Sequence, residues 1–184
     1  MKKLGLDDIL ETERCIIKIP EEWEAENIWN LITEDTTKYM IWEKSDTYLK
    51  TLESIQKNRR NAKLWTSWDS SVFDKETGEC IWMCWINKIE NKVPSFEVWY
   101  WISEQFYWKG IIPECLKKIL EVAFTELDFE KWIISCDSRN INSEKVALKC
   151  WFKFEWKFKR HKRVKWKLRD TNFYGITRQE YLKK

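Results

Sequence analysis

The chain has 184 residues, of which 34% are charged and 43% hydrophobic, and it carries a formal net charge of +3. A chain of this length can bury a core without disulfide or metal staples, so we expect a single domain over residues 1–184. No stretch approaches the roughly 18 consecutive apolar residues of a membrane span, which argues against a membrane partner. Asp7 and Asp8 follow the N-terminus too closely for a secretory signal peptide, so we expect a cytoplasmic protein.

The cysteines and the single histidine do not form a metal-binding pattern. The six cysteines include no CxxC pair, and one histidine cannot complete a Cys/His zinc cluster of the usual spacing. Several of the cysteines lie within apolar runs, where a small reduced thiol packs as a core residue. We therefore expect no metal.

Two residue counts are abnormal, because the chain has 14 Trp and only 4 Gly. Average usage of about 7% would give roughly 13 glycines. Glycine is the residue that adopts positive φ and allows close backbone approach at low cost. The sequence therefore raises the question whether tryptophan stands in place of glycine.

The predicted elements alternate between strands and helices. Apolar residues recur at helical spacing over 112–127 and alternate over 152–158. In chain order we expect a strand over 15–19, helices over 21–33 and 46–61, a strand over 65–73, a hairpin turn over 74–79, strands over 80–87 and 96–102, a helix over 112–127, a strand over 132–136, a helix over 144–149, and strands over 152–158 and 171–177. Asn142 or Ser143 is expected to cap the helix over 144–149. This order favours an α/β mixed sheet with helices on both faces.

Residues 97–112 are the best candidate for a binding site. An apolar strand, Val98 to Ile102, is followed by a turn with Lys109-Gly110 and the start of a helix. Free N–H groups and the dipole at a helix start favour an anion. Trp108 stands where such a turn needs a small side chain, and plain structural connectivity is the alternative interpretation. No GxxxxGK[ST] or GxGxxG motif occurs, which argues against P-loop and Rossmann sites.

Three further patterns have both a functional and a structural interpretation. Glu97 lies on a mostly apolar strand, where it is either a general base or a paired surface carboxylate. Asn140, Asn142 and Ser143 could bind a ligand, or serve only as a loop and helix cap. Residues 157–169 hold eight Lys/Arg and no acid, leaving 25 bases against 30 acids elsewhere. This segment is a solvated hairpin face, a strip for RNA, or a contact for a coenzyme phosphate or an acidic protein.

Several of these segments together resemble the GNAT superfamily of N-acetyltransferases, in the branch that acetylates ribosomal proteins. The matching segments are Glu11-Thr12-Glu13-Arg14, the hairpin 75–81, the strand 96–102, the turn Gln105 to Gly110, Asn140-Ile141-Asn142-Ser143 and Arg169-Asp170-Thr171. The resemblance implies a mostly antiparallel central sheet of about six or seven strands with about four helices on both faces.

The family's pyrophosphate turn reads Gln/Arg-x-x-Gly-x-Gly/Ala, and Trp108 departs from it. The family pattern has glycine at six more tryptophans: Trp82, Trp85, Trp99, Trp151, Trp156 and Trp166. We interpret all seven as glycines misread at UGA codons, which variant genetic codes translate as Trp or as Gly. Deliberate substitution and a decayed gene are the alternative interpretations. Restoring them would bring the glycine count close to the average. A chain with Trp at 99 and 108 is expected to bind acetyl-CoA weakly.

The resemblance implies transfer of an acetyl group from acetyl-CoA to an amine by direct attack in a ternary complex. Glu97, directly or through water, would take the amine proton, and Ser143 would protonate the departing thiolate. A tyrosine acid of some relatives is replaced by Ala147. The coenzyme would be held by Val98, Trp99, Tyr100, Trp101, Ile102, Gln105, Trp108, Lys109, Gly110, Ile111 and Asn140.

The acceptor that the resemblance favours is a protein N-terminal α-amino group, such as that of a ribosomal protein. A polyamine or aminoglycoside is one alternative. A catalytically impaired module that binds RNA or protein through 157–169 is another, although nucleic acid is the less favoured partner. A monomer and a homodimer are both compatible with the sequence.

Overall fold

The computed structural model describes residues 4–64, 66–89, 93–102 and 109–184, without the side chains of 85–89 and 102. Eight strands form one sheet in the order β1-β2-β3-β4-β5-β6-β8-β7. The strands are β1 (Leu10–Glu11), β2 (Cys15–Lys18), β3 (Ser70–Asp74), β4 (Cys80–Ile89), β5 (Ser95–Ile102), β6 (Lys131–Asp137), β7 (Lys153–Val164) and β8 (Lys167–Thr177). The helices are η1 (Glu22–Glu24), α1 (Ala25–Asn30), α2 (Glu34–Thr37), α3 (Leu49–Leu64), α4 (Ile111–Thr125), α5 (Ile141–Lys149) and α6 (Arg178–Tyr181).

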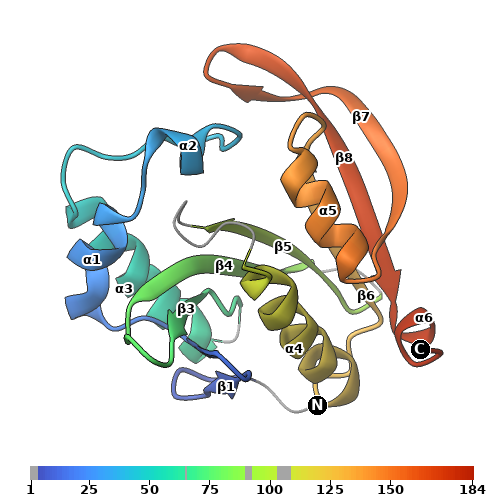
Figure 1. The fold of residues 1–184 in the computed structure, drawn as a ribbon, viewed down its shortest axis with the longest axis horizontal. Helices are drawn as coiled ribbons and strands as arrows, with labels where there is room; N and C mark the ends of the chain where they lie inside the picture. Colours follow the sequence, from blue (N-terminus) through green and yellow to red (C-terminus); the bar gives the residue numbers. More distant parts are fainter. Residues whose placement is uncertain (1–3, 65, 90–92, 103–108) are drawn as a thin grey trace.

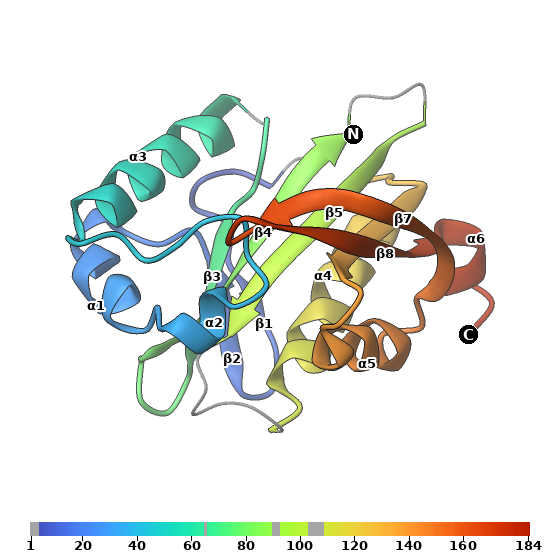
Figure 2. The same ribbon diagram turned by 90° about the horizontal axis from the view of Figure 1, so that it is seen from above.

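Helices cover both faces of the sheet, as the sequence predicts. Figure 1 shows the element order, and Figure 2 shows α1 and α3 on one side of the strands and α4 and α5 on the other. Each face has its own apolar core. The larger core packs α4 against the sheet and includes Val98, Leu116 and Trp132, while the smaller one packs α1 and α3 and includes Ile28, Ile55 and Trp101. The predicted mixed, mostly antiparallel sheet is confirmed, with β1 as a short additional edge strand.

The bounds of several elements differ from the predicted ones. The expected helix over 21–33 ends at Asn30, and Thr33 starts the separate helix α2 by accepting a hydrogen bond from the Thr36 N–H. The expected strand over 65–73 begins only at Ser70. The hairpin β7–β8 extends through the basic segment 157–169, because backbone pairing continues where the apolar pattern stops.

The strands β5 and β6 form the one parallel pair within the described part of the sheet. Their pairing runs from Ser95 opposite Lys131 to Val98 opposite Ile134. Beyond that point β5 continues to Ile102 and β6 to Asp137 without pairing with each other. The central sheet is therefore open between the C-terminal halves of these two strands.

Trp151 lies at a position that favours glycine. It follows the end of α5 with φ of 68°. The Trp151 N–H donates to the Leu148 carbonyl, and the Phe152 N–H donates to the Ala147 carbonyl, at 3.1 and 3.0 Å. These two bonds form a Schellman motif, whose left-handed residue is usually glycine.

Trp166 occupies a second such position, in the turn between β7 and β8. Val164 pairs with Lys167, so the loop consists of Lys165 and Trp166 alone. Their φ angles are 44° and 66°. Two positive φ values in a two-residue hairpin loop are the pattern of a type I′ turn, which prefers Asn-Gly. Trp166 is 88% exposed, so packing does not compensate for the left-handed backbone.

The other tryptophans at positions where the family pattern has glycine give weaker evidence that glycine belongs there. Trp82 is fully buried, and its indole N–H has no hydrogen-bond partner in the described structure. Trp156 lies beside an irregularity in β7 and stacks against Phe158. Trp108 and the side chain of Trp85 lie outside the described residues. Among the described tryptophans, only Trp151 and Trp166 therefore have a backbone that specifically favours glycine.

The cysteines are free thiols, and all except the half-buried Cys136 are buried, as expected. Across the described residues, no helix combines the length and the apolar character needed to cross a membrane.

Candidate active site

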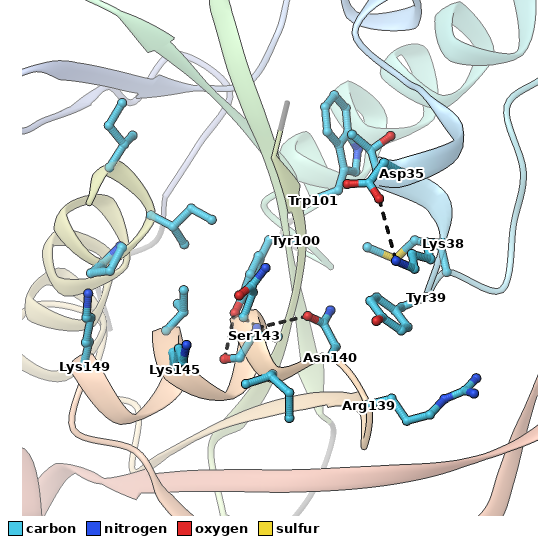
Figure 3. Close-up of a pocket in the computed structure, with 18 of the residues that line it drawn as sticks. Asp35, Lys38, Tyr39, Tyr100, Trp101, Arg139, Asn140, Ser143, Lys145 and Lys149 are labelled. Atoms are coloured by element: carbon cyan, nitrogen blue, oxygen red, sulfur yellow. Dashed lines mark hydrogen bonds and ion pairs between the residues drawn. The ribbon is translucent and has the colours of Figure 1, made fainter. Parts of the chain in front are cut away.

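A large cavity lies where β5 and β6 separate and has a volume of about 390 Å³. Tyr100 and Trp101 line it from β5, and residues 110–113 line it from the start of α4. Residues 140–143, 145, 146 and 149 line it from α5 and the residue before it, and residues 35, 36 and 38–40 line it from α2 and the loop after it. Figure 3 shows these side chains around the space. The size is in the usual range for small-molecule sites.

The start of α4 presents an anion-binding geometry to this cavity. Gly110 is the N-cap residue, with φ of 73°, and it has no side chain to cap the first turn. Arg14 stabilises the turn from outside, because its Nη1 donates to the Lys109 carbonyl at 3.0 Å and its Nη2 pairs with Glu114 at 2.5 Å. Free N–H groups at a helix start favour a phosphate or another anion.

Besides Lys38 after α2, three cations on and before α5 line the same cavity. Lys145 and Lys149 lie one turn apart on α5, and Arg139 lies in the loop before it. Sequence reasoning missed all three, because isolated lysines on an amphipathic helix look like an ordinary solvated face. Their spacing of four residues was the available signal, since it puts both lysines on one face of a helix.

A hydrogen-bonded group from β5 and α5 forms the inner wall of the cavity. The Tyr100 hydroxyl and Ser143 Oγ are 2.9 Å apart, and either can donate. Asn140 Oδ1 accepts the Ser143 N–H at 3.1 Å, so Asn140 caps α5 and the prediction of Asn142 or Ser143 as the cap is wrong. The loop reverses sharply after β6, so the helix begins at Ile141, before either predicted cap. Burial raises the pKa of Tyr100, although the Ser143 hydrogen bond lowers it in part.

Glu97 faces the other side of the sheet. Side chains alternate along a strand, so Glu97, Trp99 and Trp101 share the α1 and α3 face, while Val98 and Tyr100 face α4. The half-buried Glu97 carboxylate accepts a hydrogen bond from the Ser135 hydroxyl. The carboxylate and the Tyr100–Ser143 pair are therefore on opposite faces of β5.

A second, smaller cavity of about 40 Å³ is lined by side chains from both faces of β5. It is lined by Trp99 on β5 and by Ser135 and Cys136 on β6, and it shares Tyr100 and Ser143 with the large cavity. Burial raises the pKa of the Cys136 thiol to about 11, so this thiol stays protonated near neutral pH. The opening between β5 and β6 thus allows a group on one face to reach a group on the other.

The predicted site residues fall into four groups. The structure brings Tyr100, Trp101, Gly110, Ile111, Asn140 and Ser143 together around the large cavity. Val98 and Trp99 line the small cavity, and Glu97 lies beside it through Ser135. Gln105, Trp108 and the side chain of Ile102 lie outside the described residues. Lys109 contributes its carbonyl to the Arg14 contact, and Ala147 is buried in the core.

Comparison with known proteins agrees with this geometry. The sequence profile of the acetyltransferase (GNAT) domain matches residues 14–153. The chain belongs to the GNAT acetyltransferase family.

Curated GNAT relatives match the chain at low identity. An uncharacterized N-acetyltransferase of Bacillus licheniformis, p20, is 25% identical over 111 residues, which are 60% of this chain and 62% of that protein. A Bacillus subtilis (strain 168) protein, YdaF, named provisionally as a ribosomal N-acetyltransferase, is 24% identical over 92% of this chain and 94% of its own length.

A solved structure shows the same fold. The ribosomal L7/L12 α-N-protein acetyltransferase RimL, solved with coenzyme A, superposes with a TM-score of 0.84. The two chains are 19% identical over 92% of this chain and 98% of that chain. The GNAT fold and the resemblance to ribosomal-protein acetyltransferases are thus supported by independent comparisons.

Proposed function

We propose that this GNAT chain transfers an acetyl group from acetyl-CoA to a protein N-terminal α-amino group. The observation that carries the proposal is the end of β5–β6 pairing at Val98 and Ile134, beside the start of α4. This opening joins an anion-binding helix start on one face to a carboxylate on the other. Direct transfer requires the two bound substrates to meet in a defined geometry, and such a passage through the sheet would bring them together.

The large cavity fits the coenzyme. A pyrophosphate would accept hydrogen bonds from the N–H groups at the start of α4, after Gly110. Lys145, Lys149 and Arg139 would balance its negative charge. The β5 backbone beyond Val98 is not used in pairing with β6, so its polar groups are available to the amide-rich arm of the coenzyme.

The two faces divide the chemistry between them. The free amine attacks the thioester carbonyl carbon, a C–N bond forms, and the C–S bond breaks. Glu97, directly or through water, takes the proton that the amine loses. Ser143, hydrogen-bonded to Tyr100, donates a proton to the departing thiolate. Tyr100 on β5 thus supplies a phenol in place of the tyrosine acid that some relatives have at the position of Ala147 on α5.

The charges around the site favour a protein N-terminus over a polyamine. Of the described residues, one carboxylate, Asp35, and four cations, which include Lys145 and Lys149, line the large cavity. A polycationic acceptor needs an acidic cleft, because it would otherwise meet like charge. A peptide N-terminus carries a single positive charge and can lose it before reaction.

Thiol release from acetyl-CoA tests the proposal on a panel of N-terminal peptides, polyamines and aminoglycosides. The chain as given is compared with the chain carrying glycine at the seven tryptophan positions. Release with peptides, and its loss in Glu97→Gln but not in the surface control Glu26→Gln, supports the proposal. If thiol is released with polyamines alone, the acceptor is a polyamine and not a protein N-terminus. RNA binding without any thiol release would contradict an enzymatic function.

A further inference from the structure

One cation of the basic segment 157–169 is turned into the site. Six of its eight Lys/Arg side chains are exposed, whereas Lys162 and Arg169 are half-buried. Arg169 pairs with Asp137 on β6. Lys162 Nζ lies 3.4 Å from the centre of the Trp99 ring and lines the small cavity with Ser135 and Ser143. A lysine amine is thus held inside the cavity that is lined from both faces of β5.

The backbone of β7 causes this inward turn. Phe158 pairs with Thr171 and Lys162 with Arg169, so β7 has two more residues than β8 between these pairs. Arg160, within this bulge, has φ of 51°, and its N–H donates to Asp170 Oδ1 at 2.9 Å. Bulges bend a strand and redirect its side chains. Figure 2 shows the β7–β8 hairpin crossing over β5, which brings Lys162 above Trp99.

The chemical surroundings of Lys162 suit a reacting amine. Burial lowers the pKa of Lys162, while the nearby Glu97 carboxylate and Cys136 oppose that shift. Glu97 is the group that would take a proton from an amine, and it lies on the same face of β5 as Trp99. An amine that loses its proton more readily is a better nucleophile at neutral pH.

We propose that Lys162 is itself an acetyl acceptor, so that the protein modifies its own side chain in the cavity between β5 and β6. This inference rests on the proposed acetyl transfer. The neutral Nζ attacks the thioester carbonyl, the C–N bond forms and the C–S bond breaks. The proton of Nζ passes to Glu97, and the thiolate takes a proton from the Ser143–Tyr100 pair. The products are Nε-acetyl-lysine and coenzyme A.

Acetylation of Lys162 has a consequence for the site. The acetyl group removes the positive charge, and with it the cation–π contact to Trp99. It also adds a neutral amide to a cavity of only about 40 Å³. The modified chain should therefore accept external amines more slowly than the unmodified chain.

Peptide mapping by mass spectrometry tests the proposal. The full chain, as given and with Trp108→Gly, is incubated with acetyl-CoA, with and without an N-terminal peptide, and acetyl groups are assigned to each lysine and to the peptide over time. Lys162 should gain an acetyl group about tenfold or more faster than the exposed Lys159 on the same strand, because it is pre-positioned. The rate should not depend on protein concentration, and Lys159→Arg should leave it unchanged.

The two proposals can fail separately in this experiment. If peptide acceptors are acetylated while Lys162 reacts no faster than Lys159, the self-modification is wrong and the enzymatic proposal stands. If neither peptides nor Lys162 react in either chain, both are wrong. Labelling at Lys162 that rises with protein concentration would show reaction between molecules and would contradict a reaction within one site.

Discussion

Replacing Trp166 by glycine should stabilise the protein, although it removes the largest side chain from the hairpin turn. Trp166 has φ of 66° and is 88% exposed. A left-handed backbone costs a residue with a Cβ about 1–2 kcal/mol. Glycine avoids this cost, but its greater conformational freedom in the unfolded chain destabilises the fold by about 0.5–1 kcal/mol. Trp166→Gly should therefore be more stable than Trp166→Ala by about 0.5–1 kcal/mol.

Trp23 provides the matched control, because it is also exposed, at 73%, but lies in the short helix η1. At Trp23 the order should reverse, with glycine less stable than alanine by about 0.5–1 kcal/mol. Comparing glycine with alanine at each site cancels the loss of the ring itself. Trp151 is a less clean site, because its ring contacts Lys117 and Lys184.

Urea denaturation followed by circular dichroism measures all four variants on a common scale. A difference of about 1 kcal/mol corresponds to roughly 2–4 °C in Tm for a domain of this size. If alanine is as stable as glycine at Trp166, the left-handed backbone is not a source of strain. A UGG codon at Trp166 and Trp151 would separately refute the interpretation of these residues as misread glycines.

Three further predictions concern the site and the C-terminal helix. Replacing Lys145 and Lys149 by alanine should raise the KM for acetyl-CoA about fivefold for each lysine, with the effect shrinking at high salt. Tyr100→Phe should lower kcat about tenfold to a hundredfold at unchanged KM, because it removes a half-buried hydroxyl from the hydrogen-bonded pair. The hydrogen bond from Lys153 lowers the pKa of Glu180 from 4.5 to about 2. Because the pKa of Glu180 is lower in the folded chain than in the unfolded chain, its ionised carboxylate stabilises the fold above pH 4.5, and this stabilisation is lost as the pH falls toward 2. In urea titrations, the parent chain should therefore have a higher free energy of unfolding than Glu180→Gln above pH 4.5, and this difference should vanish toward pH 2.

The sequence predicts the secondary structure that local patterns determine. The strand through Val98 and the helix after Gly110 are confirmed, because an apolar run and a glycine turn are local signals. The hairpin after Asp74 is confirmed too, with Gly78 at φ of 71°. The break at Thr33 was missed, because the apolar spacing continues across it while the capping hydrogen bond does not show in the pattern.

The contacts within the site depend on register and could not be predicted. The Tyr100–Ser143 pair joins residues 43 apart, and the Glu97–Ser135 pair joins residues 38 apart. Neither spacing is a recognisable motif, and both follow only from the order in which β5, β6 and α5 meet. The inward direction of the Lys162 side chain could not be predicted either, because it depends on a two-residue bulge inside the basic segment 157–169.

The central claim is that the opening between β5 and β6 carries acetyl transfer to an amine. The most direct test incubates the chain carrying glycine at the seven tryptophan positions with acetyl-CoA and an N-terminal peptide, and quantifies acetyl-peptide and free coenzyme A by mass spectrometry. We expect the two products in equal amounts, with both lost in the double variant Glu97→Gln and Ser143→Ala. Equal product yields in that double variant and in the parent chain would contradict it.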